Sequence, residues 1–303
     1  MQLIKPINLI NKNLLILHLT VVVWGFTGLL GKLISISAVS LVWYRVFIAF
    51  VSLFIYFKLF KVNIIVNRTT LIILLLTGGL LATHWVLFFA SIKFSTIPVT
   101  LVCLSSITLF TAIFEPLINK KRISKLQLLA GALIITGIVI IFKFETKYTL
   151  GIIVGLISAM VASIFPIINS KMIKKNGAML IGFYELLGAF IWISIYLFFS
   201  QGFTTTIIPT YTDIFYLLIL GTICTSVAYV AGVSVMRELP VFRVALITNL
   251  EPVYGILIAF IFYRDLNNMT LGFWIGAGII LSTIIMYPIT QRKVYERKNR
   301  GNL

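Results

Sequence analysis

The stretch "PVFRVALITNLEPVYGILIAFIF", residues 240–262, is apolar over most of its length and is long enough to cross a lipid bilayer as one helix. An α-helix rises about 1.5 Å per residue, and the hydrocarbon core of a bilayer is about 30 Å thick. Near the middle of the stretch, a carboxylate and a helix breaker stand side by side at Glu251 and Pro252. The stretch therefore predicts a membrane span with a polar feature at mid-depth.

The composition extends this prediction to the whole chain. Of the 303 residues, 60% are hydrophobic and 11% are charged, whereas soluble domains carry about 25% charged residues. Apolar runs of similar length recur from end to end, and they are too continuous for barrel strands, which alternate over about ten residues. We therefore expect an all-α integral membrane protein with ten transmembrane helices, at approximately 14–34, 39–60, 70–92, 96–118, 125–143, 150–170, 178–199, 213–235, 240–262 and 270–290.

The 25 Lys and Arg residues are distributed unevenly over the connections between these spans. Basic connections are retained on the cytoplasmic side of a membrane. If the N-terminus is cytoplasmic, the opposite face receives only Lys32, Lys93, Lys143, Lys147 and Arg264. The pattern predicts cytoplasmic N- and C-termini and a location in the cytoplasmic (inner) membrane. Basic loops beside anionic lipids then explain the net charge of +17, so the expected partner is the lipid bilayer, with no nucleic acid.

Two parts of the chain are similar to each other. Residues 95–141 read "STIPVTLVCLSSITLFTAIFEPLINKKRISKLQLLAGALIITGIVII", and residues 238–286 read "ELPVFRVALITNLEPVYGILIAFIFYRDLNNMTLGFWIGAGIILSTIIM". Pro98 corresponds to Pro240, and both fit the first turn of a helix, where a missing N–H costs nothing. The fourth and fifth spans are thus repeated as the ninth and tenth.

This repeat predicts the domain organisation. Each half holds five spans, an odd number, so the second half must enter the bilayer from the opposite face. We expect two inverted five-helix repeats, at residues 1–147 and 148–303, the second with a basic cytoplasmic tail.

Four motifs, taken in order, carry a resemblance to a known family. They are "WGFTGLLGK" at 24–32, "WYRVFIAF" at 43–50, "TNLEPVYGILIAFIFYRD" at 248–265 and "LGFWIGAGIIL" at 271–281. The chain resembles the EamA-type permeases of the drug/metabolite transporter superfamily. The resemblance implies transport of small organic solutes, often amino acids or related metabolites, by alternating access. It also implies that spans one to four and six to nine surround the cavity, with spans five and ten at the edge.

The sequence departs from the family pattern at one place. In the family a Glu commonly follows the fourth and ninth spans, whereas this chain carries Lys121 at the first position and Arg264 with Asp265 at the second. We therefore transfer no role for that Glu to this protein.

Glu251 is the strongest candidate for a substrate-binding residue. A charge at the bilayer centre costs about 2.5–3.5 kcal/mol on insertion scales, so it persists only where something faces it or pairs with it. Glu251 is expected either to line a cavity, where it binds an ammonium group or exchanges a proton, or to hydrogen-bond to backbone freed at a kink or hinge at Pro252. Asn249 adds a donor on the same turn.

Other polar side chains inside the spans have two interpretations each. Glu185 is expected in the cavity or in a structural pair with a neighbouring helix, and Arg45 either binds substrate or extends to the interface. His84 is expected as a hydrogen-bonded residue of the bundle in preference to a proton relay. The aromatic residues that could wall the cavity, or only pack, are Trp24, Trp43, Trp85, Tyr184, Tyr229 and Tyr254.

The residue inventory separates the possible functions. The only other histidine is His18, so no metal site is expected, and the lack of a GxxxxGK(S/T) loop argues against a nucleotide cofactor. A membrane-embedded transferase would need paired carboxylates or His and Asp near an interface, but Asp213 and Asp265 are isolated. We expect a secondary transporter for a small-molecule solute, with export as the direction, no cofactor and no enzymatic activity. A transferase and a non-cycling channel or scaffold remain as alternatives.

Two GxxxG patterns predict close helix packing, "GIIVG" at 151–155 and "GFWIG" at 272–276. Such patterns occur both within a bundle and between the subunits of a homodimer. We favour packing within the chain and keep a homodimer as the alternative.

Overall fold

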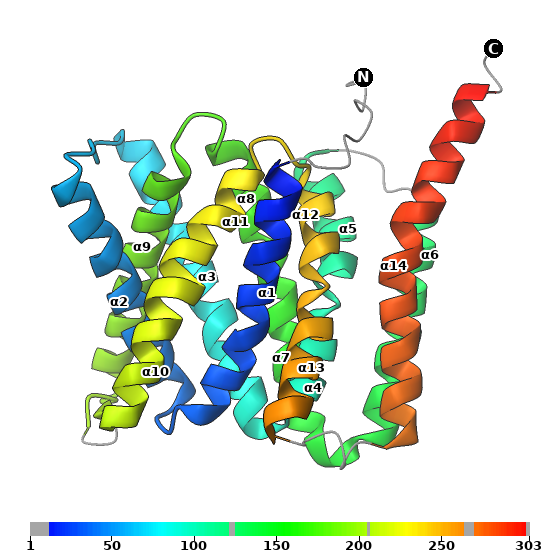
Figure 1. Cartoon of the computed structure of the whole chain (residues 1–303), viewed down its shortest axis with the longest axis horizontal. Helices are drawn as coiled ribbons and strands as arrows, with labels where there is room; N and C mark the ends of the chain where they lie inside the picture. The colour runs from blue at the N-terminus through cyan, green and yellow to red at the C-terminus, as the bar shows by residue number, and fades with distance from the viewer. Residues whose placement is uncertain (1–11, 121–124, 205–206, 264–269, 301–303) are drawn as a thin grey trace.

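The computed structural model describes residues 12–120, 125–204, 207–263 and 270–300, and every regular element in these ranges is a helix (Figure 1). Arg264, Asp265 and Lys121, which mark the departure from the family pattern, lie outside the described residues. The first half of the chain forms α1 (Lys12–Leu33), α2 (Ala38–Leu59), α3 (Arg68–Phe94), α4 (Ile97–Leu104), α5 (Ile107–Ile118) and α6 (Lys125–Phe144). The second half forms η1 (Thr146–Tyr148), α7 (Thr149–Ala162), α8 (Phe165–Met172), α9 (Ala178–Phe199), α10 (Tyr211–Gly221), η3 (Thr222–Val227), α11 (Ala228–Val235), α12 (Val241–Thr248), α13 (Glu251–Tyr263) and α14 (Leu271–Arg300).

Many of these helical stretches have the length and composition of membrane spans. Within the described residues, eight are apolar and long enough to cross a bilayer: Lys12–Leu33, Ala38–Leu59, Arg68–Phe94, Ile97–Ile118, Thr146–Met172, Ala178–Phe199, Tyr211–Val235 and Val241–Ile258. Shorter apolar helical segments occur at Leu129–Ile141 and Leu271–Tyr287. The protein is therefore a multi-pass membrane protein.

Several helices begin where the sequence predicts. The side chain of Asn67 accepts a hydrogen bond from the backbone N–H of Thr70 and caps α3, and Thr96 caps α4 in the same way through Val99. Pro98 lies in the first turn of α4, and Pro240 is the N-cap residue of α12. These residues satisfy or remove N–H groups that a helix start leaves unpaired.

Three of the long stretches are interrupted along their length. The break between α4 and α5 falls at Ser105 and Ser106, the break between α7 and α8 at Ser163, and the break between α12 and α13 at Asn249. The hydroxyl of Ser106 donates to the carbonyl of Cys103 at 2.6 Å. Irregular backbone at membrane depth persists only where such bonds satisfy it and protein or water surrounds it. The breaks therefore indicate the interior of the bundle.

Pairs of helix contacts recur in matching sets. Helix α3 packs on α7 and α9, and the α10–η3–α11 segment packs correspondingly on α1 and α2. Helix α4 packs on α7, as α13 packs on α1, while α4 and α5 meet α13 and α12. Helices α6 and α14 pack on each other at one side of the molecule (Figure 1). This is the contact pattern that two repeats related by an approximate twofold axis produce.

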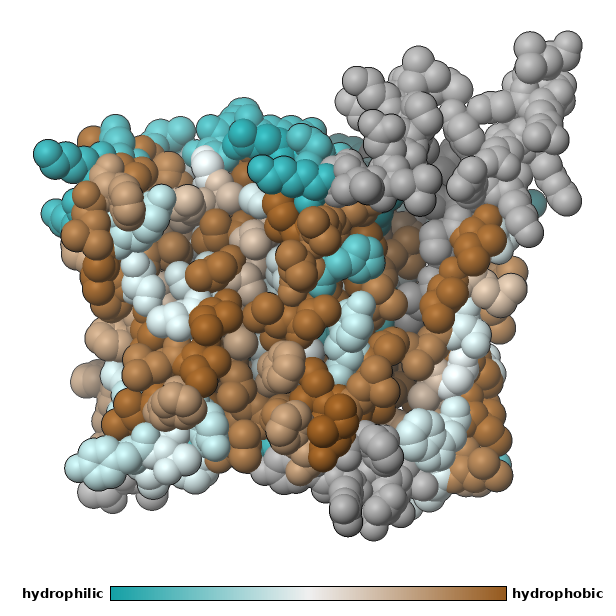
Figure 2. All heavy atoms as spheres, in the orientation of Figure 1, coloured by the Kyte–Doolittle hydropathy of each residue, from teal (hydrophilic) through white to brown (hydrophobic). Residues whose placement is uncertain are grey.

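The face of the bundle that Figure 2 shows is largely apolar in its middle part. Many large hydrophobic side chains of the molecule are exposed, among them Leu76, Ile195, Phe198 and Leu257. An extensive exposed apolar surface is expected against lipid tails. Hydrophilic side chains gather at the end of the bundle where α1 begins, the upper end in Figure 2, and the basic residues there include Lys58, Lys61, Arg68, Lys171, Lys174, Lys175 and Arg237.

Helices α3 and α9 cross at glycines. A Cβ atom on Gly78 would lie 2.2 Å from the backbone oxygen of Glu185, and one on Gly188 would lie 2.5 Å from the backbone oxygen of Leu75. These distances are far shorter than any real contact, so the two backbones approach this closely only because both positions lack a side chain. The glycines of "GIIVG" and "GFWIG" also meet residues of the same chain, such as Ser95 and Gly137.

We expect Gly78→Ala to destabilise the folded protein by about 1–3 kcal/mol, because the added methyl group must push the two helices apart. The measurement is the melting temperature of the purified protein in detergent. Gly278→Ala is the matched control, since a Cβ at Gly278 meets nothing within 4 Å. Equal melting temperatures for the two variants would contradict this account of the crossing.

Candidate functional site: a cavity between the interrupted helices

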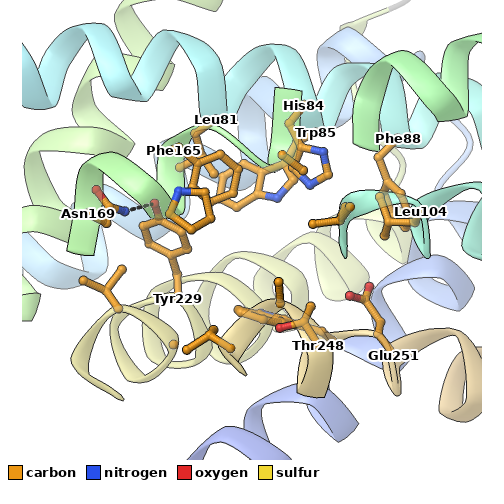
Figure 3. A pocket seen from close by; sticks show the side chains of 18 of the residues that line it. Leu81, His84, Trp85, Phe88, Leu104, Phe165, Asn169, Tyr229, Thr248 and Glu251 are labelled. Atoms are coloured by element: carbon orange, nitrogen blue, oxygen red, sulfur yellow. Dashed lines mark hydrogen bonds between the residues drawn. The ribbon is translucent and has the colours of Figure 1, made fainter. Parts of the chain in front are cut away.

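A cavity of about 100 Å³ lies between the three interrupted stretches (Figure 3). Each break places a residue from both of its sides on the cavity wall: Leu104 and Ile107, Ala162 and Phe165, and Thr248 and Glu251. Helices α1, α2, α3 and α11 complete the wall, while no described side chain of α6 or α14 lines it. The helix interruptions and the cavity are thus parts of one feature at the centre of the bundle.

Many of the candidate residues from the sequence line this cavity. They are Trp24, Arg45, His84, Trp85, Tyr229 and Glu251. His84 and Trp85 lie across the cavity from Thr248 and Glu251 (Figure 3). Aromatic rings thus form much of the wall, and charged or polar groups face the space from α2, α3 and α13.

Three other candidates do not line the cavity. The amide of Asn249 donates to the hydroxyl of Thr108 on α5, so it links two of the interrupted stretches to each other. The hydroxyl of Tyr184 donates to the backbone oxygen of Ile64 at 2.6 Å. Glu185 lies behind Tyr229, whose hydroxyl donates to it. Each of these side chains is therefore bonded to a protein partner outside the set of cavity-lining residues or behind it.

Arg45 is a buried cation, 2% exposed. Its Nε donates to the hydroxyl of Thr225 at 2.5 Å, and its guanidinium lies 4.0 Å from the centre of the Trp85 ring. Thr225 belongs to the π-helical segment η3, and its hydroxyl donates to the backbone oxygen of Leu220 at 2.6 Å. Arg45 forms no ion pair with any described residue. A positive charge is therefore held at the cavity wall, where it interacts with the charge of Glu251 without direct contact.

Glu251 is a buried carboxylate, 7% exposed, at the first position of α13. Its side chain points into the cavity (Figure 3), and it forms no side-chain hydrogen bond with the part of the chain that the structure describes. The N-terminus of a helix carries a partial positive charge that favours an anion. Pro252 lies in the first turn of α13, where its missing N–H costs nothing. The break before Glu251 thus presents this carboxylate to the cavity.

His84 is fixed by two contacts to Ser158 on α7. Its Nδ1 lies 2.9 Å from the hydroxyl and 3.1 Å from the backbone oxygen of Ser158, and that hydroxyl donates to the backbone oxygen of His84 at 2.9 Å. These bonds tie α3 to α7. Within the described residues no group of three or more His, Cys, Asp or Glu side chains could hold a metal ion.

Asn169 is a site residue that was not predicted from the sequence. Its amide nitrogen lies 3.1 Å from Glu185 Oε2 and 3.2 Å from the hydroxyl of Tyr229. A lone amide inside the apolar stretch "FPIINS" was the available signal. The lining threonines Thr27, Thr111 and Thr248 were harder to find. Threonine is common in membrane helices, where its hydroxyl bonds to its own helix, as Thr27 does to Trp24.

Comparisons with known proteins agree with this architecture. The model of the EamA-like transporter family matches residues 11–143 and 149–287. A solved crystal structure, described only as that of a protein, is 14% identical and has a TM-score of 0.66, with coverage of 92% of this chain and 98% of the other. At that identity the likeness concerns the fold alone. No curated protein matches the chain.

Proposed function

Because the chain belongs to the EamA-like transporter family, whose model matches both of its halves, we propose that it moves a small zwitterionic solute, such as an amino acid, across the membrane by alternating access. The observation that carries the proposal is the pair of opposite charges on one cavity. Arg45 and Glu251 both line it and both are buried, and their charges interact with each other without forming a direct ion pair.

A zwitterion would satisfy both charges at once. Its carboxylate would pair with the guanidinium of Arg45, and its ammonium group would pair with the carboxylate of Glu251. Burying unpaired charges costs several kcal/mol each, and a ligand that pairs both offsets that cost only when it is bound. The rings of Trp24, Trp85 and Phe165 supply an apolar surface for the rest of the solute. A cavity of about 100 Å³ admits a single small molecule.

The proposed membrane topology is ten helices in two inverted repeats, at residues 1–147 and 148–303, with both termini in the cytoplasm. The basic residues at the end where α1 begins support this orientation, because positive residues favour the cytoplasmic side of the inner membrane. The paired helix contacts of the two halves support the inverted arrangement.

Alternating access requires one closed end, and buried side chains support closure at the end where α1 and α3 finish, the lower end in Figure 1. Ile34, Leu41, Ile92 and Ile97 are at most 1% exposed there. Asp213 accepts hydrogen bonds from the backbone N–H and the hydroxyl of Ser35, at 2.7 and 2.6 Å, and so ties the α1–α2 connection to α10. The cavity-lining half-helices α8, α11 and α12 lie toward the opposite, basic end. We propose that the cavity loads from the cytoplasm and that export is the working direction.

The test is binding and flux with matched analogues. The purified protein is screened for thermal stabilisation by amino acids, and the best ligand is followed in proteoliposomes. We expect saturable flux, with weak competition by the methyl ester, which lacks the anion, and by the N-acetyl derivative, which lacks the cation. Equal competition by all three compounds would refute the zwitterion. Flux that rises linearly with concentration would indicate a channel.

A further inference from the structure

A second buried polar cluster lies behind the cavity wall, where α8, α9 and α11 meet. Glu185 on α9 is completely buried, and its Oε2 accepts a hydrogen bond from the hydroxyl of Tyr229 at 2.6 Å. The amide nitrogen of Asn169, also completely buried, lies 3.1 Å from the same oxygen and 3.2 Å from the tyrosine hydroxyl (Figure 3 shows this last contact). Two donors therefore converge on one oxygen of one carboxyl group.

The remaining oxygens of the cluster have no partner. Glu185 Oε1 and Asn169 Oδ1 are both buried without a hydrogen bond in the described part of the protein. Both atoms are acceptors, so what the cluster lacks is a donor or a positive charge. A carboxyl proton on Glu185 converts one orphan acceptor into a donor.

Among the described residues, no cation neutralises Glu185. Helices α2, α3 and α11 pack on α9, and α8 meets it through Asn169. Lys58 on α2 and Lys171 on α8 are exposed, and the buried ionisable groups of these helices are committed elsewhere or uncharged. Arg45 on α2 is directed to Thr225 and Trp85, His84 on α3 is bonded to Ser158, and Tyr229 on α11 offers only a hydroxyl. Glu251 differs, because the positive charge of Arg45 acts on it. A buried carboxylate without a cation is far costlier than the protonated acid, so burial favours the neutral form of Glu185.

Two members of the cluster lie between Glu185 and the cavity. Tyr229 and Asn169 line the cavity and also touch Glu185. The backbone of α9 at Glu185 is held against α3 by the Gly78 crossing, whereas Tyr229 and Asn169 lie on the separate short helices α11 and α8. A shift of these short helices would open Glu185 to cavity water.

We propose that Glu185 is a proton-binding site that couples solute movement to a proton gradient, with Tyr229 and Asn169 as its gate. The proton passes from cavity water to the carboxylate when the gate is open, and it is carried on Glu185 when the gate is closed. This proposal rests on the proposed transport function. The zwitterion is bound by Arg45 and Glu251, so the two sites are distinct.

The first experiment compares solute uptake into proteoliposomes with and without an imposed pH gradient, in either polarity. A gradient of one pH unit can support an accumulation of about tenfold per proton. We expect the wild-type protein to show a severalfold stimulation by one polarity, and Glu185→Gln to show a ratio near one. Glu238→Gln, the same change at an exposed carboxylate, should keep the wild-type ratio.

Two outcomes of this experiment would overturn the proposal: a stimulation of Glu185→Gln equal to that of the wild type, or a wild-type response to a sodium gradient in place of a pH gradient. Wild-type protein without any saturable flux would instead refute the transport function itself. The two failures are therefore distinguishable.

A second measurement does not depend on transport. The infrared spectrum of the reconstituted protein at neutral pH should contain a protonated-carboxyl C=O band that disappears in Glu185→Gln and persists in Glu238→Gln. Persistence of every such band in Glu185→Gln would show that Glu185 carries no proton, whether or not the variant transports solute.

Discussion

Replacing Glu251 with Gln is expected to weaken binding of a zwitterionic solute about a hundredfold while leaving the protein folded. The substitution keeps the shape of the side chain and removes only its charge. Truncating one partner of a buried charge pair costs about 2–5 kcal/mol, and about 2.7 kcal/mol corresponds to a hundredfold in affinity. Since Glu251 makes no side-chain hydrogen bond within the described residues, the substitution breaks no hydrogen bond and removes only the charge interaction with Arg45.

The dissociation constant, measured by titration calorimetry, and the melting temperature together test this prediction. The loss should be specific for the ammonium group, so the deaminated analogue, which carries only a carboxylate, should bind the wild type and Glu251→Gln equally weakly. Glu238→Gln provides a control at an exposed carboxylate. If Glu251→Gln binds the zwitterion as tightly as the wild type does, the carboxylate has no role in recognition.

Replacing Arg45 is expected to have a comparable effect on the opposite end of the solute. Arg45→Gln removes the only buried Arg or Lys side chain of the described residues, and we expect affinity to fall by a hundredfold or more. Arg45→Lys retains a charge but loses the planar group that lies over Trp85 and reaches Thr225. We therefore expect an intermediate loss for Arg45→Lys.

Analogues again identify the group that Arg45 recognises. The methyl ester of the solute lacks the carboxylate, so it should bind the wild type and Arg45→Gln with equal, low affinity. Thr225→Val is the matched control, because it removes the Nε contact and keeps the charge. If Arg45→Gln weakens binding of the methyl ester as much as binding of the zwitterion, the substitution has altered the cavity as a whole and not only the carboxylate contact.

These two residues illustrate how far a sequence alone can identify a site. Arg45 and Glu251 are conspicuous because a charge inside an apolar span is costly, and that cost can be judged from the neighbours along the chain. Glu185 is also a charge inside an apolar span, but its position along the sequence does not show whether its side chain faces the cavity or Tyr229. Asn169 is uncharged, so its position in an apolar span did not mark it as a site residue, although it completes the cluster around Glu185.

The helix interruptions also differ in whether the sequence marks them. The break at Asn249 lies three residues before Pro252 and the break at Ser163 lies three residues before Pro166, so a local disturbance was predictable at both, whereas the break at Ser105 has no proline or glycine close to it. These serines are held by hydrogen bonds from their hydroxyls to carbonyls three residues earlier or more, as between Ser163 and Met160 at 2.6 Å. Such a break is stable only in the packed surroundings that the other helices provide.

Membrane spans, their approximate ends, the family and the existence of a repeat could all be read from the chain, because lipid imposes a length and a polarity on each segment separately. The residues that line the cavity could not be predicted from the sequence, because they depend on the rotation of each helix about its axis. That rotation is set by contacts such as the Gly78 crossing and the bond between Asn249 and Thr108, which join residues far apart in the sequence. Packing between helices therefore decides which of the buried polar side chains meet a solute and which meet one another.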